Sequence, residues 1–251
     1  MTQRRCASID VGTNSAKMTI ADVVENTTSW VLDESAVTRL GEGMQGTRKF
    51  LQEVPMRRTL EAIKHFAQVA EQEGVEAVAA VGTAALRDAE NRTEFVRRVY
   101  EATGISVEVI SGEEEARLSY LAVRLDPHWQ NHQHLIVIDV GGGSTEVIFG
   151  QDTQIVSRIS VNTGAVKLTS AILRSDPPTI AQLSNANLEA KRQFEGVPFG
   201  YDPATAVVVG VGGTLSNLSA MEFGKFVTAE TLHGYELSLD ALEYRMEQLA
   251  T

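Results

Sequence analysis

The sequence predicts an α/β fold built from two related halves, and two observations carry that prediction. Short apolar runs alternate with segments of helical periodicity, which is typical of strands joined by helices with substantial parallel pairing. A strand–turn–strand pattern also occurs twice, once around Asp10 and once around Asp139, and Ile, Asp, Val, Gly and Ser coincide in the two copies. A repeat in two segments this far apart in the sequence indicates two similar halves, each supplying one loop to a shared cleft.

The first half is expected to begin with three strands, over residues 5–11, 16–24 and 28–38. A helix then begins near Pro55, because proline suits the first helical position, and ends at Gly74. A buried strand over residues 75–81 leads into a turn that opens one helix ending near Gly104. A further strand is expected over residues 105–110.

The second half is expected to follow a helix that begins at Glu113 and ends near Arg124. The polar segment from Asp126 to His134 is interpreted as a linker, so the predicted domains are residues 1–125 and 126–251. Beyond the linker the expected strands are residues 135–138, 147–149, 154–161 and 206–209, and the expected helices are residues 164–174, 180–194 and 238–249.

The composition is that of an ordinary globular protein. Of the 251 residues, 43% are hydrophobic and 22% are charged, and the formal net charge is −11. This acidity argues against a broad nucleic-acid surface, which needs clustered Lys and Arg. No run approaches the roughly 20 apolar residues of a membrane span, and the single cysteine fits a reducing compartment. We therefore expect a cytoplasmic protein with no membrane and no nucleic-acid partner.

The glycine turns carry the clearest chemical signal. Glycines without Cβ let successive backbone N–H groups converge on an anion, and neighbouring hydroxyls add donors. A third glycine turn follows the apolar run that ends at Val209, which weakens the alternative that these turns only close hairpins. The residues expected to bind phosphate are Gly12, Thr13, Asn14 and Ser15 in the first loop, Gly141, Gly142, Gly143, Ser144 and Thr145 in the second, and Gly212, Gly213 and Thr214 in the third.

Carboxylates flank these loops, although a negatively charged carboxylate repels a negatively charged phosphate. Asp139 and Glu146 bracket the second loop, and Asp10 precedes the first. The arrangement makes sense if a divalent cation lies between the carboxylates and the anion. We therefore predict a metal site formed by Asp139 together with Glu146 or Asp10.

Four further residues leave alternatives open. Glu113, Glu114 and Glu115 open a helix, where acidic side chains compensate the helix dipole, but one of them could instead face the cleft as a general base. Arg87 near a helix start is unfavourable against the dipole. That position indicates anion binding about as strongly as salt bridging to a neighbouring acidic residue.

The histidines give a weaker signal. His128, His132 and His134 cluster in the polar segment, where no cysteine accompanies them, so an exposed linker explains them better than a metal site. His233 beside Gly234 is interpreted as structural.

Taken together, the motifs resemble those of a known family. Asp10 to Ser15 and Asp139 to Glu146 look like the two phosphate loops of the actin/Hsp70/sugar-kinase superfamily. More specifically, two motifs in combination resemble the exopolyphosphatase/guanosine pentaphosphate phosphohydrolase (Ppx/GppA) family. These motifs are Gly82-Thr83 through Arg87-Asp88-Ala89-x-Asn91, and Ser111-Gly112-x-x-Glu115-Ala116-Arg117. The similarity runs along nearly the whole chain and includes Leu232-His233-Gly234-Tyr235.

The resemblance implies a ribonuclease H-like, actin-type ATPase fold with two domains flanking a cleft. It implies removal of terminal phosphate from inorganic polyphosphate or guanosine pentaphosphate, with Glu115 as the general base and Arg87 on the phosphate. In the same family, the residues matching Asp139 and Glu146 are associated with Mg²⁺ and catalysis. Polyphosphate or guanosine penta- or tetraphosphate would be the ligand, and the family also allows a homodimer.

Family members usually continue beyond the position of Thr251, so this chain is expected to be a fragment or a short variant. Two alternative functions stay open at this point. An ATP-dependent kinase or ATPase of the same superfamily would bind adenine nucleotide near the turn from Gly210 to Thr214. A non-catalytic sensor would bind the same anions without turnover.

Overall fold

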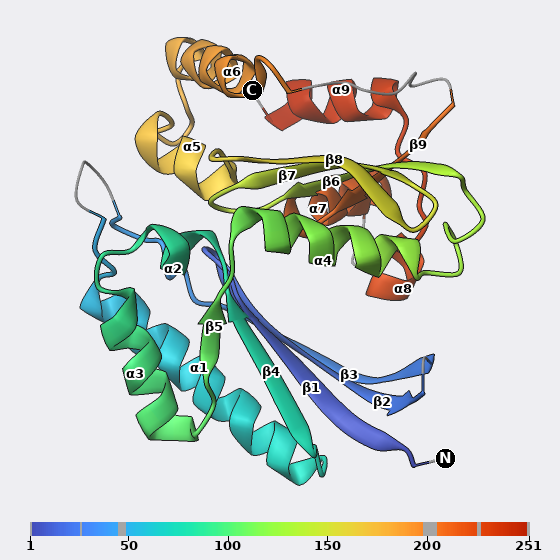
Figure 1. Ribbon diagram of the computed structural model, residues 1–251. Helices are drawn as coiled ribbons and strands as arrows, with labels where there is room; N and C mark the ends of the chain where they lie inside the picture. The colour runs from blue at the N-terminus through green and yellow to red at the C-terminus, as the bar shows by residue number, and fades with distance from the viewer. Residues whose placement is uncertain (1, 26, 45–48, 198–204, 225–226, 250–251) are drawn as a thin grey trace. The chain divides into compact units, whose positions relative to one another are not determined.

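The computed structural model describes residues 2–25, 27–44, 49–197, 205–224 and 227–249 (Figure 1). The chain divides into two compact units, Met1–Ser111 and Gly112–Thr251. The boundary differs from the one expected after residue 125, because the helix that begins at Gly112 packs on the sheet of the second unit. The polar segment 126–134 therefore joins two elements of the second unit and is not a linker between units.

The first unit contains a five-stranded sheet in the order β3-β2-β1-β4-β5. Strand β1 runs antiparallel to β2 and parallel to β4, as the alternation of strands and helices predicts. Ile9, Met18 and Ile20 from the sheet are buried together with Ile63 and Phe66 of the long helix α1. The strands are β1 (Arg4–Val11), β2 (Ser15–Val24), β3 (Thr27–Val37), β4 (Ala77–Gly82) and β5 (Val107–Val109), and α1 spans Glu53–Gln72.

The single helix expected before Gly104 is two helices, α2 (Ala84–Asp88) and α3 (Arg92–Thr103). The chain leaves helical geometry at Ala89, whose ψ is 130°. The side-chain oxygen of Asn91 accepts the N–H of Leu51 at 2.9 Å, and its amide nitrogen donates to the carbonyl of Leu51 at 3.1 Å. These long-range bonds hold the break open, and no local propensity signals them.

The second unit contains a four-stranded sheet in the order β8-β7-β6-β9. Helix α4 (Gly112–Arg124) covers one face, where its Tyr120 packs with Val137 and Ile148 (Figure 1). Phe194 of α6 (Ile180–Phe194) packs with Phe149 on the other face. The strands are β6 (His134–Val140), β7 (Thr145–Gln151), β8 (Gln154–Val161) and β9 (Val207–Val211).

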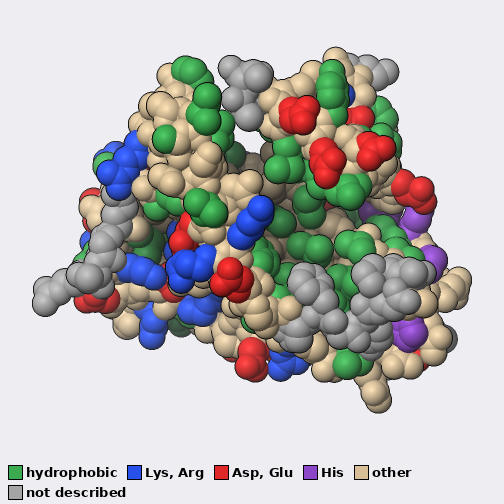
Figure 2. Space-filling model, turned by 90° about the horizontal axis from the view of Figure 1, so that it is seen from above, with side chains coloured by type: hydrophobic (Ala, Val, Ile, Leu, Met, Phe, Trp, Pro, Cys, Tyr) green, Lys and Arg blue, Asp and Glu red, His purple; other side chains and the backbone are tan. Residues whose placement is uncertain are grey.

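Four shorter helices complete the second unit: α5 (Ala165–Ala171), α7 (Gly213–Glu222), α8 (Ala229–Leu232) and α9 (Leu239–Leu249). Ile180 and Leu188 of α6 and Leu239 of α9 are exposed. Figure 2 looks onto the side of the unit that carries α6 and α9, and it shows hydrophobic side chains at the surface there. Within the described part of the chain, no helix is both long and apolar enough to cross a membrane.

Candidate active site

The two glycine loops close in the same way, as the sequence repeat predicts. In the first loop the N–H of Gly12 donates to the carbonyl of Ser15 at 3.0 Å. In the second, the N–H of Gly141 donates to the carbonyl of Ser144, also at 3.0 Å. A Cβ added at Gly12 would lie 2.9 Å from the Ser15 oxygen, and one added at Gly141 would lie 3.0 Å from the Ser144 oxygen. Both loops therefore need glycine as their first residue.

The tip of the second loop offers backbone donors. The carbonyls of Gly141 and Gly142 accept N–H groups of Ala165 and Lys167 in α5, which anchors the loop. Among the residues that the structure describes, no protein acceptor receives the N–H groups of Gly142 and Gly143. Adjacent amides of this kind are the donors that an oxyanion requires.

Asp139 and Glu146 stand directly opposite each other on β6 and β7. Residues paired in this register share one face of the sheet, with Cβ atoms about 4.5–5.5 Å apart. Glu146 is only 1% exposed, and Ser160 of β8 donates to its Oε1 at 2.6 Å. Ser119 of α4 donates to Oδ2 of Asp139 at 2.9 Å.

This pair of carboxylates fits a divalent cation. Like charges directly opposite on neighbouring strands repel each other, and a divalent cation between two carboxylates turns that repulsion into a shared attraction. Two carboxylates held side by side by hydroxyl groups provide the oxygen ligands that Mg²⁺ prefers. Asp139 and Glu146 are therefore the residues of the second unit that could hold the metal.

The third glycine turn lies against Asp139. Gly212 has a φ of +90°, and a Cβ added there would lie 2.8 Å from Oδ1 of Asp139. The hydroxyl of Thr214 donates to the carbonyl of Val140 at 3.1 Å. Because β6 and β9 are parallel, their carboxyl ends meet at one edge of the sheet, and α7 begins there at Gly213. The positive end of the α7 dipole thus adds to an edge suited to anions.

Helix α4 presents its three acidic residues differently. Glu115 and Ser119 are four residues apart, about 40° around the helix, so they share a face, and Ser119 contacts Asp139. Glu114 is held by a bidentate ion pair with Arg117, at 2.7 and 2.9 Å. The hydrogen bonds from Arg117 lower the pKa of Glu114, which makes that carboxylate a weaker base.

Glu113 is the most exposed of the three glutamates. Its side chain is 78% exposed, and its Oε2 lies 3.3 Å from the guanidinium of Arg158. Helical geometry therefore places Glu115, rather than Glu113 or Glu114, on the face that Ser119 turns toward Asp139.

The first unit carries the remaining predicted residues. Two hydrogen bonds anchor its glycine loop of residues 12–15: the carbonyl of Asn14 accepts the N–H groups of Thr38 and Arg39, at 3.0 and 2.8 Å. The amides of Thr13 and Asn14 themselves reach no protein acceptor among the described residues. Asp10 is exposed on β1, where it pairs opposite Lys17.

Arg87 is not at a helix start. It lies in the last turn of the short helix α2, where a basic side chain suits the dipole, so the predicted conflict with the dipole is wrong. Its guanidinium donates to the carbonyl of Ile110 at 3.2 Å. The neighbouring Asp88 forms an ion pair with Lys49, whose Nζ lies 2.7 Å from Oδ2 of Asp88.

Ser119 and Ser160, which hydrogen-bond the two carboxylates, are the residues of the candidate site that the sequence did not indicate. Ser119 could have been found from its i+4 spacing to Glu115 on the expected helix. Ser160 could not, because only the register of β7 with β8 sets it opposite Glu146.

The chain matches the model of the Ppx/GppA phosphatase family over residues 19–250. The protein belongs to the Ppx/GppA phosphatase family. Exopolyphosphatase 2 of Mycobacterium tuberculosis is 34% identical to it over 238 residues, which cover 88% of this chain and 72% of that protein.

Solved structures agree with the family match. The Ppx/GppA enzyme of Aquifex aeolicus aligns with a TM-score of 0.80 at 32% identity, over 99% of this chain and 81% of that one. An exopolyphosphatase from Cytophaga hutchinsonii aligns with a TM-score of 0.82 at 25% identity, over 98% and 80%. A component of the PilM–PilN type IV pilus complex, at 11% identity and a TM-score of 0.51, shares the fold alone.

These matches confirm the predicted resemblance, the actin-type α/β fold and the assignment of this Ppx/GppA protein as a phosphohydrolase. They do not favour the ATP-dependent kinase or the non-catalytic sensor.

Proposed function

We propose that this Ppx/GppA protein removes terminal phosphate groups from inorganic polyphosphate, with Mg²⁺ or another divalent cation as cofactor. The observation that carries the proposal is the in-register pair of Asp139 and Glu146, supported by Ser119 and Ser160, beside the glycine loop that begins at Gly141. An anion-binding loop next to paired carboxylates suits a phosphate that arrives with a divalent cation.

Asp139 and Glu146 would hold the cation. When bound, it would supply positive charge to neutralise the phosphate oxygens as negative charge develops on them. Asp10, predicted as an alternative to Glu146 beside Asp139, stays a candidate from the first unit. In the second unit, we assign the 141–145 loop, through the amides of Gly142 and Gly143, and residues 212–214 as the phosphate donors; the amide of Gly141 already donates to Ser144.

In the first unit, the loop of residues 12–15 and the guanidinium of Arg87 are assigned to phosphate oxygens of the substrate. Their donors are backbone amides and a permanently charged fork that matches phosphate geometry. Catalysis of phosphoryl transfer depends mostly on such positioning and charge stabilisation.

Glu115 is assigned as the general base. It accepts a proton from the water whose oxygen attacks the terminal phosphorus. As the new P–O bond forms, the bond to the bridging oxygen breaks, and the shortened chain leaves with that electron pair. Orthophosphate is the second product, and the proton on Glu115 passes to solvent or to a product oxygen. General base catalysis of this kind contributes roughly 10²–10⁴-fold.

Polyphosphate is the proposed substrate because two of the relatives above carry the name exopolyphosphatase. Guanosine pentaphosphate presents the same terminal anhydride, so both compounds are compatible with the assigned residues. A cytoplasmic location and a homodimer stay predictions.

The test is release of orthophosphate from long-chain polyphosphate in the presence of Mg²⁺, with the remaining chains sized on a gel. We expect orthophosphate to be released and the chains to shorten, and the rate on guanosine pentaphosphate, measured in parallel, decides which of the two compounds is preferred. Asp139→Asn and Glu146→Gln should each lower the rate on the order of 100-fold or more. Asp152→Asn is the matched control, because Asp152 is an exposed acid in the same unit and is predicted to keep full activity.

Either of two results would overturn the proposal. One is a folded wild-type protein that releases no phosphate from polyphosphate at any Mg²⁺ concentration. The other is wild-type activity in both carboxylate variants.

A further inference from the structure

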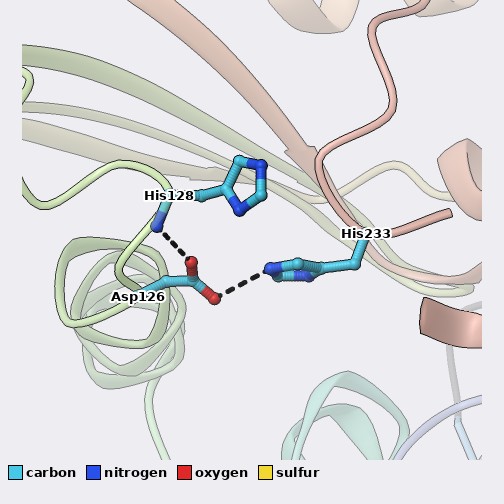
Figure 3. Close-up of side chains that lie close together, drawn as sticks. All are labelled: Asp126, His128 and His233. Carbon is cyan, nitrogen blue, oxygen red and sulfur yellow. Dashed lines mark hydrogen bonds and ion pairs between the residues drawn. The ribbon is translucent and has the colours of Figure 1, made fainter. Parts of the chain in front are cut away.

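A second cluster of ligand-type side chains lies at the other end of α4. Asp126, His128 and His233 each offer one ligand atom, and these atoms all lie within 4.8 Å of one another (Figure 3). Asp126 and His128 follow α4, whereas His233 follows α8, more than one hundred residues later. Histidine side chains also gather along the right edge of Figure 2.

The aspartate is held by both histidines. Its Oδ1 accepts the backbone N–H of His128 at 2.8 Å, and its Oδ2 lies 3.1 Å from Nε2 of His233. Figure 3 shows the carboxylate between these two contacts, with the ring of His128 beside that of His233. The backbone bond to Oδ1 fixes the aspartate rotamer before any ligand binds.

The surroundings of the cluster limit how far the two rings can move. The indole of Trp129 lies 5.3 Å from the His233 ring and 5.5 Å from the His128 ring, centroid to centroid. Gly234 has a φ of +71°, and a Cβ there would lie 2.6 Å from Nε2 of His128. Glycine at 234 therefore lets the second segment approach His128 closely.

We propose that Asp126, His128 and His233 form a binding site for a divalent transition-metal cation of the Zn²⁺ type. Two imidazole nitrogens and one carboxylate oxygen are a ligand set that suits Zn²⁺, and a fourth position is left for water. Ligand atoms about 2.0–2.2 Å from one tetrahedral ion lie about 3.4 Å from each other. The 3.1 Å separation of Asp126 and His233 already matches that spacing, and the remaining approach requires only small side-chain rotations.

This site is separate from the carboxylate pair of the proposed active site. Asp126 lies eleven positions after Glu115, which is about 16 Å along α4 and its C-terminal turn at the helical rise. The two sites also differ in chemistry, because the carboxylate pair offers only oxygen and suits Mg²⁺. A cation bound by the cluster would connect the segment after α4 to the segment between α8 and α9.

The test is binding of Zn²⁺ to the full chain in excess Mg²⁺, which occupies oxygen-only sites, measured by equilibrium dialysis and by tryptophan fluorescence. We expect one Zn²⁺ per chain. Asp126→Asn and His128→Ala should each weaken binding about 100-fold or more, since even loss of a supporting hydrogen bond costs roughly 10–100-fold. His132→Ala is the matched control: it removes an exposed histidine of the same segment that is outside the cluster, and it should bind like the wild type.

Hydrogen exchange gives an independent readout. Zn²⁺ should protect backbone amides of residues 229–236 in the wild type and in His132→Ala, but not in His128→Ala. Thermal unfolding without Zn²⁺ should be similar for all variants, which separates lost binding from lost folding. A wild-type dissociation constant for Zn²⁺ above about 1 mM would overturn the proposal. So would an equal loss of Zn²⁺ affinity in His132→Ala and His128→Ala.

Discussion

Removing the hydroxyl of Ser119 tests whether α4 positions Asp139 for the cation. Ser119→Ala deletes one donor, 2.9 Å from Oδ2 of Asp139, and alanine keeps the helix intact. A hydrogen bond to a charged group contributes about 1.5–3 kcal/mol. Ser119 is only partly buried, so we expect the lower value, about 1.5 kcal/mol, which is a factor of about ten in affinity.

The expected result is a roughly tenfold higher Mg²⁺ concentration at half-maximal rate, with the rate recovered at saturating Mg²⁺. The assay is phosphate release from polyphosphate across a range of Mg²⁺ concentrations. Ser119→Thr keeps a hydroxyl and should restore the wild-type midpoint, and Leu118→Ala is a control on an exposed neighbour. A wild-type Mg²⁺ midpoint in Ser119→Ala would refute the positioning role.

Two further predictions concern stability. Gly150→Ala would place a Cβ 2.0 Å from Cζ of the fully buried Tyr120. The urea midpoint of unfolding should therefore fall by the equivalent of about 1–3 kcal/mol. An unchanged urea midpoint would show that the ring of Tyr120 can move aside. The hydrogen bonds from Arg5 are the chief cause of the lowered pKa of Asp22. The pair therefore stabilises the first unit fully at pH values above the ordinary aspartate pKa of 3.8. That contribution is lost as the pH falls through the lowered pKa. Asp22→Asn should therefore be less stable than the wild type at pH 7, and urea unfolding curves of the two should converge in acid; a difference that stays constant from pH 7 to below pH 3 would contradict this.

Local patterns predicted most of the fold. The glycine loops were predictable because a tight turn between two paired strands requires residues without Cβ at defined places, and Gly12 and Gly141 meet that requirement in the same way. The strands on either side were predictable from their apolar runs. Pro55 and Gly74 likewise marked the ends of α1 closely.

Features set by distant contacts were not predictable from the sequence. The break between α2 and α3 depends on Asn91 bonding to Leu51, forty positions earlier. The pairing of Asp126 with His233 depends on how α8 returns to the end of α4. For the same reason, a polar segment after α4 was interpreted as a linker although it connects two elements of one unit.

The candidate site was predictable in part. Residues 139 and 146 were found because they flank a glycine loop, but only the register of β6 with β7 sets them opposite each other. Among three adjacent glutamates, the sequence alone left the base undecided. The contact of Ser119 with Asp139 and the ion pair of Glu114 with Arg117 now favour Glu115.

The most direct test of the central claim compares Glu115→Gln with Glu113→Gln and Glu114→Gln, by phosphate release from polyphosphate at saturating Mg²⁺. If Glu115 is the base, its variant alone should lose roughly 10²–10⁴-fold in rate while still binding polyphosphate, and the two neighbours should stay near wild type. Full activity in Glu115→Gln, or an equal loss in all three variants, would contradict the account.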